Sequence, residues 1–322
     1  MRIAFFGTPE FAVPTLRALA KTSHTLAVFT QPDRPVGRKA ILTPPPVKAA
    51  ALELGLPVYQ FEKIRSAEGC AAIRDFAPDL YAVVAFGQLF SDENLAIPPL
   101  GAINVHGSLL PLYRGASPMQ QTVIDGQKTA GVSTMKLVKR MDAGDILMKA
   151  ETPLGVNETY GELAVRLADM GADLFIRTLD ALEHGQLVST PQEEDKATFA
   201  HKIAKTDGLI DWSKSSDYIE RLLRAYTPWP GCYTFLPSRF RKKGNTGRVV
   251  ITGVEFAKVD PSRRNELPGT VLEVTKRGPV IRTGTTALLL TALKPEGAKE
   301  MAGGAFLSGR PLEPIKDMLL SE

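Results

Sequence analysis

The chain has 322 residues, of which 44% are hydrophobic and 23% are charged, so it can bury a substantial core and has room for two domains. Its first apolar run, residues 3–6, stops at Gly7 and is too short for a signal peptide or a membrane span. We therefore expect a cytoplasmic protein that does not enter a membrane. Cys70 and Cys232 are widely separated in sequence, which excludes a disulfide framework and a multi-cysteine zinc site.

The formal net charge of +4 is distributed unevenly along the chain. Residues 1–205 carry 21 Lys and Arg against 22 Asp and Glu, whereas residues 206–322 carry 18 against 13. The basic excess therefore belongs to the C-terminal third. Phosphates attract Lys and Arg with little need for sequence, so this third could bind a polyanion. A solvated basic surface would give the same counts, and charge alone leaves both interpretations open.

Apolar strand-like runs alternate with helical stretches through the first two hundred residues. Strands are expected at residues 3–6, 26–30, 80–86, 102–106, 132–138 and 146–151, and helices at residues 9–20, 47–54 and 160–184. Near-continuous apolar strands separated by helices predict an α/β, Rossmann-like fold over residues 1–188, with a mostly parallel sheet covered by helices on both faces. Ligands of such sheets bind at the carboxyl ends of the strands.

A second domain is expected after a linker. Residues 189–206 lose the apolar period and include Pro191 and a short acidic run, which is typical of a linker. A helix is then expected at residues 217–226, and short strands at residues 248–256, 269–274, 279–282 and 287–292. Short strands separated by turns predict a small OB-like β-barrel domain over residues 207–322.

Several common catalytic motifs are missing from the sequence. Gly7 is the single glycine at the end of the first strand, which excludes the Gly-x-Gly-x-x-Gly dinucleotide fingerprint and a P-loop. No His-Glu-x-x-His or paired-cysteine spacing predicts a metal site, and no Gly-x-Ser-x-Gly predicts a serine nucleophile. Any catalysis is therefore expected to use other side chains.

Asn104 and His106 form the strongest candidate site. They are two residues apart on one expected strand, so both side chains leave the same face and can meet one substrate atom. A tight turn, residues 107–111, follows at the strand end, where sites are commonly built. The three other histidines fall where structural roles are more common, at His24, His184 and His201.

Asp142 lies in a turn between two of the expected strands. An aspartate before Ala-Gly is more often a turn former than a catalyst. The position of Asp142 alone therefore leaves a structural and a catalytic role open.

Three blocks of sequence around these residues are similar to the signature of the folate-dependent formyltransferases. They are Asn104-Val105-His106-Gly107-Ser108-Leu109-Leu110-Pro111, Tyr113-Arg114-Gly115-Ala116-Ser117-Pro118 and Met141-Asp142-Ala143-Gly144-Asp145. The similarity extends over nearly the full length, from Gly7-Thr8-Pro9-Glu10-Phe11-Ala12 through residues 30–38 to Ile210-Asp211-Trp212 and Pro228-Trp229-Pro230-Gly231. The chain as a whole thus resembles this family.

The resemblance implies an enzyme that transfers a formyl group from 10-formyltetrahydrofolate to an amine without a metal. Asn104 would donate to the developing oxyanion, a contribution of about 3 to 4 kcal/mol for comparable donors. His106 would donate to the same oxygen or shuttle the proton, and Asp142 would orient the imidazole or a water and stabilise positive charge. The residues expected to bind the folate are Phe86, Gly87, Leu89, Ser108, Leu109, Leu110 and Pro111.

The connection over residues 31–46 is the main clue to the acceptor. It has about 16 residues without a regular element of its own, where 2 to 6 are usual. In the family this loop reaches the acceptor end of a transfer RNA, so the resemblance implies initiator methionyl-tRNA as partner and a role in translation initiation. Where the family often has Gly-Lys-Lys after the arginine of this loop, this chain has Lys39-Ala40-Ile41, which leaves a smaller basic patch. The residues expected to contact the tRNA are Arg34, Arg38 and Lys39 in the loop and Arg241, Lys242 and Lys243 in the second domain.

Two other interpretations remain open. The chain could be a folate-dependent formyltransferase that acts on a small amine, such as a sugar amine or glycinamide, and the basic loop and second domain argue against this. It could instead be a non-catalytic RNA-binding relative, and the intact Asn104, His106 and Asp142 argue against that. The protein is expected to act as a monomer.

Overall fold

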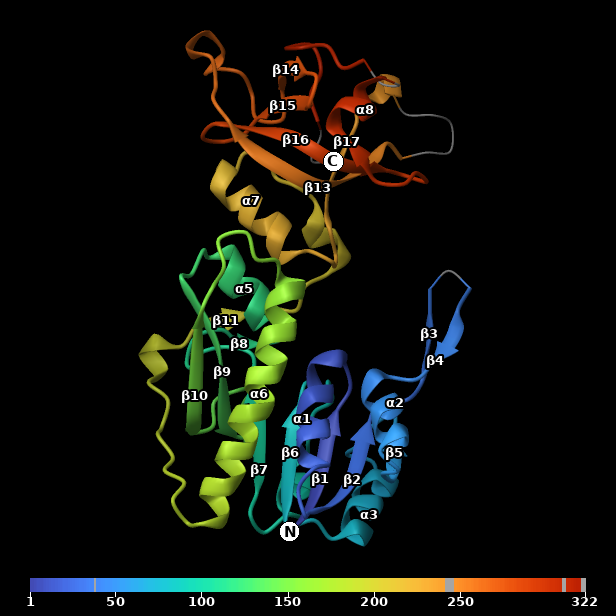
Figure 1. The fold of residues 1–322 in the computed structure, drawn as a ribbon, viewed down its shortest axis with the longest axis vertical. Helices are drawn as coiled ribbons and strands as arrows, with labels where there is room; N and C mark the ends of the chain where they lie inside the picture. Colours follow the sequence, from blue (N-terminus) through green and yellow to red (C-terminus); the bar gives the residue numbers. More distant parts are fainter. Residues whose placement is uncertain (38, 241–245, 309–310, 320–322) are drawn as a thin grey trace. The chain divides into compact units, whose positions relative to one another are not determined.

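The structure is a computed structural model that describes residues 1–37, 39–240, 246–308 and 311–319 (Figure 1). The chain divides into two compact units. The first unit comprises Met1–Met119, Lys128–Gly155 and Glu162–His201, and the second comprises Gln120–Gln127, Val156–Gly161 and Lys202–Glu322. The stretch expected to be a linker, residues 189–206, is thus divided, with its residues through His201 in the first unit.

A seven-stranded sheet forms the centre of the first unit. Its strands, in spatial order, are β10 (Ile146–Pro153), β9 (Thr129–Lys136), β7 (Ala102–His106), β6 (Leu80–Val84), β1 (Arg2–Gly7), β2 (Thr25–Thr30) and β5 (Val58–Gln60). The five strands from β7 to β5 are parallel, whereas β9 is antiparallel to β7 and β10 is antiparallel to β9. The predicted mostly parallel sheet is confirmed.

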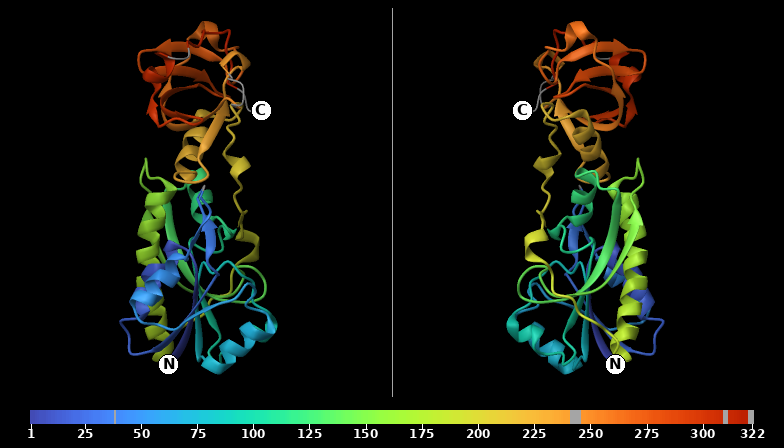
Figure 2. Two further views of the ribbon diagram at one scale, coloured as in Figure 1. Left: turned by 90° about the vertical axis from the view of Figure 1, so that its right-hand side faces the viewer. Right: turned by 90° about the vertical axis from the view of Figure 1, so that its left-hand side faces the viewer.

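Helices cover both faces of this sheet, as predicted (Figure 2). The helices of the first unit are α1 (Val13–Leu19), α2 (Pro46–Glu53), α3 (Ala67–Phe76), α4 (Asp92–Leu95) and nearly all of α6 (Tyr160–Glu183), whereas most of α5 (Pro118–Ile124) belongs to the second unit. Ile3 and Phe5 of β1 pack into a core with α1, α2 and α6, whereas Phe6 points into the opposite core, beside α3. Successive strand residues point to opposite faces, so one uninterrupted apolar strand supplies both cores. Each large apolar side chain buried in this way contributes about 1.5–3 kcal/mol.

Several elements begin or end at residues other than those predicted; the strand predicted at residues 132–138, for example, is β9, Thr129–Lys136. The strand predicted over residues 80–86 ends at Val84, because Ala85 and Gly87 adopt left-handed backbone conformations with φ of 47° and 78°. The helix predicted from Pro9 begins with a 3₁₀ turn, Glu10–Ala12, before α1. In the described ranges no helix is both long and apolar enough to cross a bilayer.

The expectation that residues 31–46 hold no regular element is wrong, because they form a hairpin of β3 (Arg34–Val36) and β4 (Ile41–Thr43). Both strands have three residues and are exposed throughout, so they show no alternation of polar and apolar residues that a pattern could reveal. At the base of the hairpin, Lys48 Nζ lies 2.8 Å from both carboxylate oxygens of Asp33. Gln60 Nε2 donates to Asp33 Oδ1 at 2.8 Å, and the hydrogen bonds from Gln60 and Lys48 hold the pKa of Asp33 below its usual range.

The second unit is built on an antiparallel sheet. Its strands are β12 (Cys232–Phe235), β13 (Arg248–Ala257), β16 (Ala287–Pro295), β15 (Gly278–Arg282) and β14 (Val271–Thr275) in spatial order, with β17 (Met301–Ala302) also paired to β16. The helices α7 (Ser216–Ala225) and α8 (Gly303–Ser308) accompany it. The predicted small β domain is therefore confirmed as an antiparallel sheet domain, although the sequence pattern did not reveal β12.

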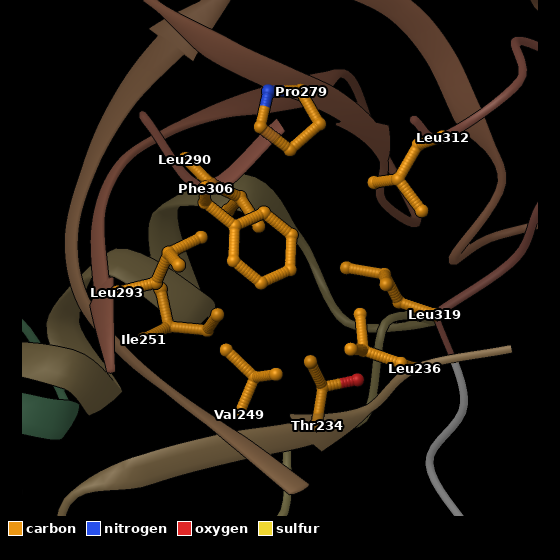
Figure 3. Close-up of a pocket in the computed structure, with 10 residues that line it drawn as sticks. All are labelled: Thr234, Leu236, Val249, Ile251, Pro279, Leu290, Leu293, Phe306, Leu312 and Leu319. Carbon is orange, nitrogen blue, oxygen red and sulfur yellow. The ribbon is translucent and has the colours of Figure 1, made fainter. Parts of the chain in front are cut away.

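The interior of the second unit is mostly apolar. Apolar side chains from its strands and from α8 surround a cavity of about 10 Å³ (Figure 3). Its lining consists of Thr234, Leu236, Val249, Ile251, Pro279, Leu290, Leu293, Phe306, Leu312 and Leu319. A space of this size holds no more than a water-sized molecule, so it is a packing defect of the core rather than a ligand site.

Candidate active site

Asn104 and His106 lie on β7, close to the carboxyl end of the parallel part of the sheet. Ile103 and Val105 pack into the core that contains α6, so the side chains of Asn104 and His106 project from the opposite face. Both are largely buried, with 8% and 6% of their surface exposed. In the part of the chain that the structure describes, the side-chain amide of Asn104 makes no hydrogen bond to protein, and it is not among the fully buried unpaired atoms, so part of it remains accessible. It is therefore available to a ligand.

The imidazole of His106 is held between two acceptors. Nε2 lies 2.9 Å from the carbonyl oxygen of Tyr113, and since a carbonyl only accepts, Nε2 carries the hydrogen. Nδ1 lies 3.7 Å from Asp142 Oδ2, which is too long for a hydrogen bond but short enough for attraction between charges. A proton taken up at Nδ1 would therefore face a carboxylate.

Asp142 is fixed in an uncommon conformation. Its φ of 49° lies in the left-handed region, and its carboxylate accepts a hydrogen bond from the backbone N–H of Gly115 at 2.7 Å. Two residues later, Gly144 packs against β9 so closely that a Cβ would lie 1.9 Å from the carbonyl oxygen of Lys136. The turn around Asp142 is thus held on both sides.

The turn that follows β7 is tied to β9 through Ser133. Ser133 Oγ donates to the carbonyl oxygen of Ser108 at 2.7 Å and accepts from the N–H of Leu110 at 3.1 Å. Ser108 Oγ in turn donates to the carbonyl oxygen of Leu112 at 2.6 Å. This turn has a fixed shape beside His106, and its Leu110–Pro111 peptide bond is cis.

The predicted folate-binding residues fall into three groups by environment. Ser108 and Leu110 are buried, whereas Leu109 and Pro111 are half-buried in the same turn. The ring of Phe86 is buried in an aromatic cluster with Phe6 and Phe90, so it has no free face for a pterin. Gly87 and Leu89 are exposed beside it.

The predicted tRNA-binding residues are only partly within the described residues. Arg34 is exposed on β3 and lies 2.5 Å from Glu62, and Lys39 is exposed at the hairpin turn. The remaining predicted contacts lie outside the described residues, namely Arg38, Arg241, Lys242 and Lys243.

Three residues around Asp142 were not identified from the sequence. Arg114 is fully buried, its Nε donates to Gln192 Oε1 at 3.0 Å, and its guanidinium forms two bonds to the carboxylate of Glu194. These bonds from Arg114, with a further one from Arg140, hold the pKa of Glu194 below its usual range. Arg114 was the one signal in the sequence that could have led to these residues. A charged arginine is rarely buried without an acidic partner, so an arginine inside an active-site motif predicts a nearby carboxylate.

Among the residues that the structure describes, no group of three His, Cys, Asp or Glu side chains is suited to hold a metal ion. The groups that the site presents are an amide, an imidazole and a carboxylate. Together they can stabilise a negative oxygen and move a proton.

Two family models match the chain. The model described as "Formyl transferase" matches residues 1–179, and the model described as "Formyl transferase, C-terminal domain" matches residues 202–311. Together they cover the seven-stranded sheet, Asn104, His106 and Asp142, most of α6 and most of the second unit.

Curated relatives match over nearly the whole chain. A methionyl-tRNA formyltransferase of Citrifermentans bemidjiense is 42% identical over 98% of this chain and 95% of its own length. A second, of Desulfotalea psychrophila, is 43% identical over 96% and 93%. Among solved structures, an N-formyltransferase from Helicobacter canadensis in complex with folinic acid and dTDP-3-aminofucose matches with a TM-score of 0.61 at 15% identity, over 89% of this chain and 98% of that one. At that identity the match shows the fold alone.

Proposed function

The chain belongs to the formyl transferase family, and we propose that it transfers the formyl group of 10-formyltetrahydrofolate to the amino group of initiator methionyl-tRNA. The names of the curated relatives support the acceptor. The family supports a folate donor. The product would be N-formylmethionyl-tRNA, which serves translation initiation.

One observation carries the proposal for the site: the buried Asn104 amide has no hydrogen-bond partner among the described residues, on the same strand face as His106. When the amine attacks the formyl carbon, negative charge develops on the carbonyl oxygen. An amide N–H that is carried by a strand and lies largely out of water stabilises this charge with little reorganisation. Asn104 is therefore the proposed oxyanion donor.

His106 and Asp142 are the proposed proton-handling pair. The attacking nitrogen becomes positively charged and must lose a proton, while the nitrogen that leaves on tetrahydrofolate must gain one. His106 Nδ1 carries the free lone pair, since Nε2 donates to Tyr113, and it can accept the first proton and return it to the leaving nitrogen. Asp142, 3.7 Å away, stabilises the imidazolium in between.

The folate is proposed to lie against the turn after β7 and the segment after β6. The turn supplies Ser108, Leu109, Leu110 and Pro111, and the segment supplies the exposed Gly87 and Leu89. Phe86 would support this segment from inside, because its ring is packed in the core and its carbonyl oxygen accepts hydrogen bonds from Thr8 and Gln31.

The acceptor is proposed to be held by two basic regions. The β3–β4 hairpin presents Arg34 and Lys39, with Arg38 assigned from the sequence, and guanidinium groups of this kind can pair with phosphate or stack on an unpaired base. The second unit would add Arg241, Lys242 and Lys243, also from the sequence. The first unit would thus carry the catalysis and the second would bind tRNA, in a monomer that works in the cytoplasm.

Formyl transfer to purified initiator methionyl-tRNA tests the function directly. We expect the wild type to form N-formylmethionyl-tRNA from 10-formyltetrahydrofolate, and Asn104→Ala to lower kcat by about 10²–10³-fold. Asn157→Ala is the matched control, because Asn157 is exposed and belongs to the second unit rather than to the unit that carries Asn104. No transfer by the wild type, or full activity of Asn104→Ala, contradicts the proposal.

Competition between acceptors separates the two enzymatic interpretations. Methionyl-tRNA, a nucleotide-linked amino sugar and glycinamide ribonucleotide are offered together with one pool of donor. We expect formyl groups to appear on methionyl-tRNA. Preferential transfer to either small amine would assign the chain to a different member of the family.

A further inference from the structure

The segment after α6, predicted to be part of a linker, reaches the active site through Gln192. Gln192 Nε2 donates to two backbone carbonyl oxygens of the catalytic turn, those of Asp142 at 2.8 Å and Gly144 at 2.7 Å. Its Oε1 accepts from Arg114 Nε at 3.0 Å. The oxygen must face the arginine, which has no acceptor, so both amide hydrogens are committed to the turn that carries Asp142.

These bonds close a ring around Asp142. Arg114 is followed in the chain by Gly115, whose N–H binds the carboxylate of Asp142 at 2.7 Å. Arg114 also binds Gln192, and Gln192 binds the main chain of Asp142. Two neighbouring residues of one short strand, β8 (Arg114–Gly115), therefore fix Asp142. Gly115 binds its carboxylate directly, and Arg114 holds its backbone through Gln192.

The ring is anchored to the rest of the first unit. β8 pairs with β11 (Phe199–Ala200), and Gly115 has room there for a hydrogen but not for a Cβ, which would lie 2.4 Å from the carbonyl oxygen of Ala200. Glu194 neutralises the buried guanidinium of Arg114 through bonds of 3.0 and 3.2 Å. Arg114 therefore cannot turn away from Gln192 without leaving a buried charge unpaired.

We propose that Gln192 is a positioning residue for the formyl transfer, which acts by holding Asp142 at its distance from His106. The proposal rests on the proposed function, because it assigns Asp142 to the reaction. The left-handed backbone conformation of Asp142 costs free energy in residues other than glycine, although aspartate adopts it more readily than most, so bonds that hold this turn stabilise it. Gln192 makes no bond to His106 or Asn104, so its effect reaches the reaction through Asp142.

The substitution Gln192→Glu provides the test, because it keeps the shape and the acceptor for Arg114 but replaces the donor that binds the two carbonyl oxygens. A carboxylate that is shifted by about 1 Å can cost up to about 100-fold in rate, so we expect kcat to fall by about 10- to 100-fold. KM for methionyl-tRNA and for 10-formyltetrahydrofolate should stay within about twofold of the wild type. Gln186→Glu, an exposed change of the same kind, is the matched control and should be silent.

A double-variant cycle shows whether the effect passes through Asp142. If it does, Gln192→Glu costs nothing further in an Asp142→Ala background, whereas a general loosening of the fold would multiply the two losses. Gln192→Ala is made in parallel, and all variants should keep the thermal unfolding midpoint of the wild type within a few degrees. Multiplied losses in the cycle overturn the proposal.

Hydrogen exchange separates this inference from the proposed function. The N–H of Gly115 should exchange faster in Gln192→Glu than in the wild type, because its acceptor on Asp142 is no longer held in place. This readout needs no turnover, so it remains decisive if the wild type does not formylate methionyl-tRNA. Unchanged exchange at Gly115 means that Gln192 does not position Asp142.

Discussion

The active site and the β3–β4 hairpin belong to the same unit but are built differently. At the active site, His106, Asp142, Arg114 and Gln192 are linked by hydrogen bonds and ion pairs between parts of the chain far apart in sequence. In the hairpin, the side chains of both strands are exposed, including three apolar ones, Val36, Ile41 and Leu42.

This difference indicates a division of work within the first unit. A reaction centre needs groups fixed to a fraction of an ångström, and a closed network provides this. A surface that meets a large polyanion needs reach and exposed contacts instead. The hairpin is fixed at its base, where Lys48 and Gln60 hold Asp33, while the side chains of its two strands are exposed, as the proposed contact with tRNA requires.

The largest expected effect belongs to the active site. His106→Ala should lower kcat by about 10²–10⁴-fold, the range for loss of a general acid–base group, while the unfolding free energy changes little. The measurement is steady-state formylation of methionyl-tRNA, with His184→Ala as control, because His184 is an exposed histidine in the turn directly after α6. A loss of less than about threefold would remove His106 from the proton transfer.

A matched pair of glycine substitutions compares the rigidity of the two regions. A Cβ at Gly144 would lie 1.9 Å from a backbone oxygen, whereas one at Gly37 in the hairpin turn meets nothing within 4 Å and is strained only by a φ of +72°. Gly144→Ala should lower the unfolding free energy by about 2 kcal/mol or more and reduce kcat, whereas Gly37→Ala should cost about 1 kcal/mol and leave kcat unchanged. Denaturant unfolding measures the loss of unfolding free energy in each variant. Equal losses in the two variants would contradict the proposed difference in rigidity between the two regions.

Lys39 at the hairpin turn tests the binding side of the comparison. Lys39→Ala should raise KM for methionyl-tRNA about threefold to tenfold, with kcat unchanged, because one phosphate contact is lost. The dependence of kcat/KM on salt should become shallower by about one charge. Lys21→Ala, an exposed lysine elsewhere in the first unit, is the control, and a fall in kcat alone would place Lys39 in catalysis rather than binding.

The smallest expected effect is a dependence of stability on pH that involves Glu194. Its pKa is lower in the folded state because Arg114, and then Arg140, bind its charged form. A depressed carboxyl pKa stabilises the fold above the unfolded pKa, and this contribution is lost as pH falls through the folded pKa. Thermal midpoints of wild type and Glu194→Gln should therefore differ more at pH 7 than at pH 3. A difference between the two thermal midpoints that stays constant or grows at pH 3 would contradict a stabilising role for the charged form of Glu194.

The sequence predicted much of this architecture because its signals are local. Uninterrupted apolar strands separated by helices indicated the parallel sheet, and the spacing of Asn104 and His106 placed both on one face. The placement of Asp142 beside His106 came from family resemblance, since a turn aspartate has no distinguishing pattern of its own.

The rest depends on contacts that no local pattern carries. Arg114 and Gln192 are 78 positions apart in the chain. The pairing of β8 with β11 brings their two segments together, and these strands have two residues each, too few for an alternation of polar and apolar residues to be recognised. Gln192 lies among polar residues that are typical of a linker, and its partners on the catalytic turn are backbone carbonyl oxygens, which every residue has. The exposed hairpin was hidden for the same reason, because neither of its strands buries a face.

The ring around Asp142 also affects the order in which the protein matures. During synthesis, Asn104, His106 and Asp142 leave the ribosome well before Gln192, Glu194 and β11 do. A nascent chain that ends near residue 188 would contain every group proposed to handle the proton or the oxyanion, yet lack the bonds that fix one of them. Because such long-range contacts form late, the growing chain should become competent only after Ala200 has emerged.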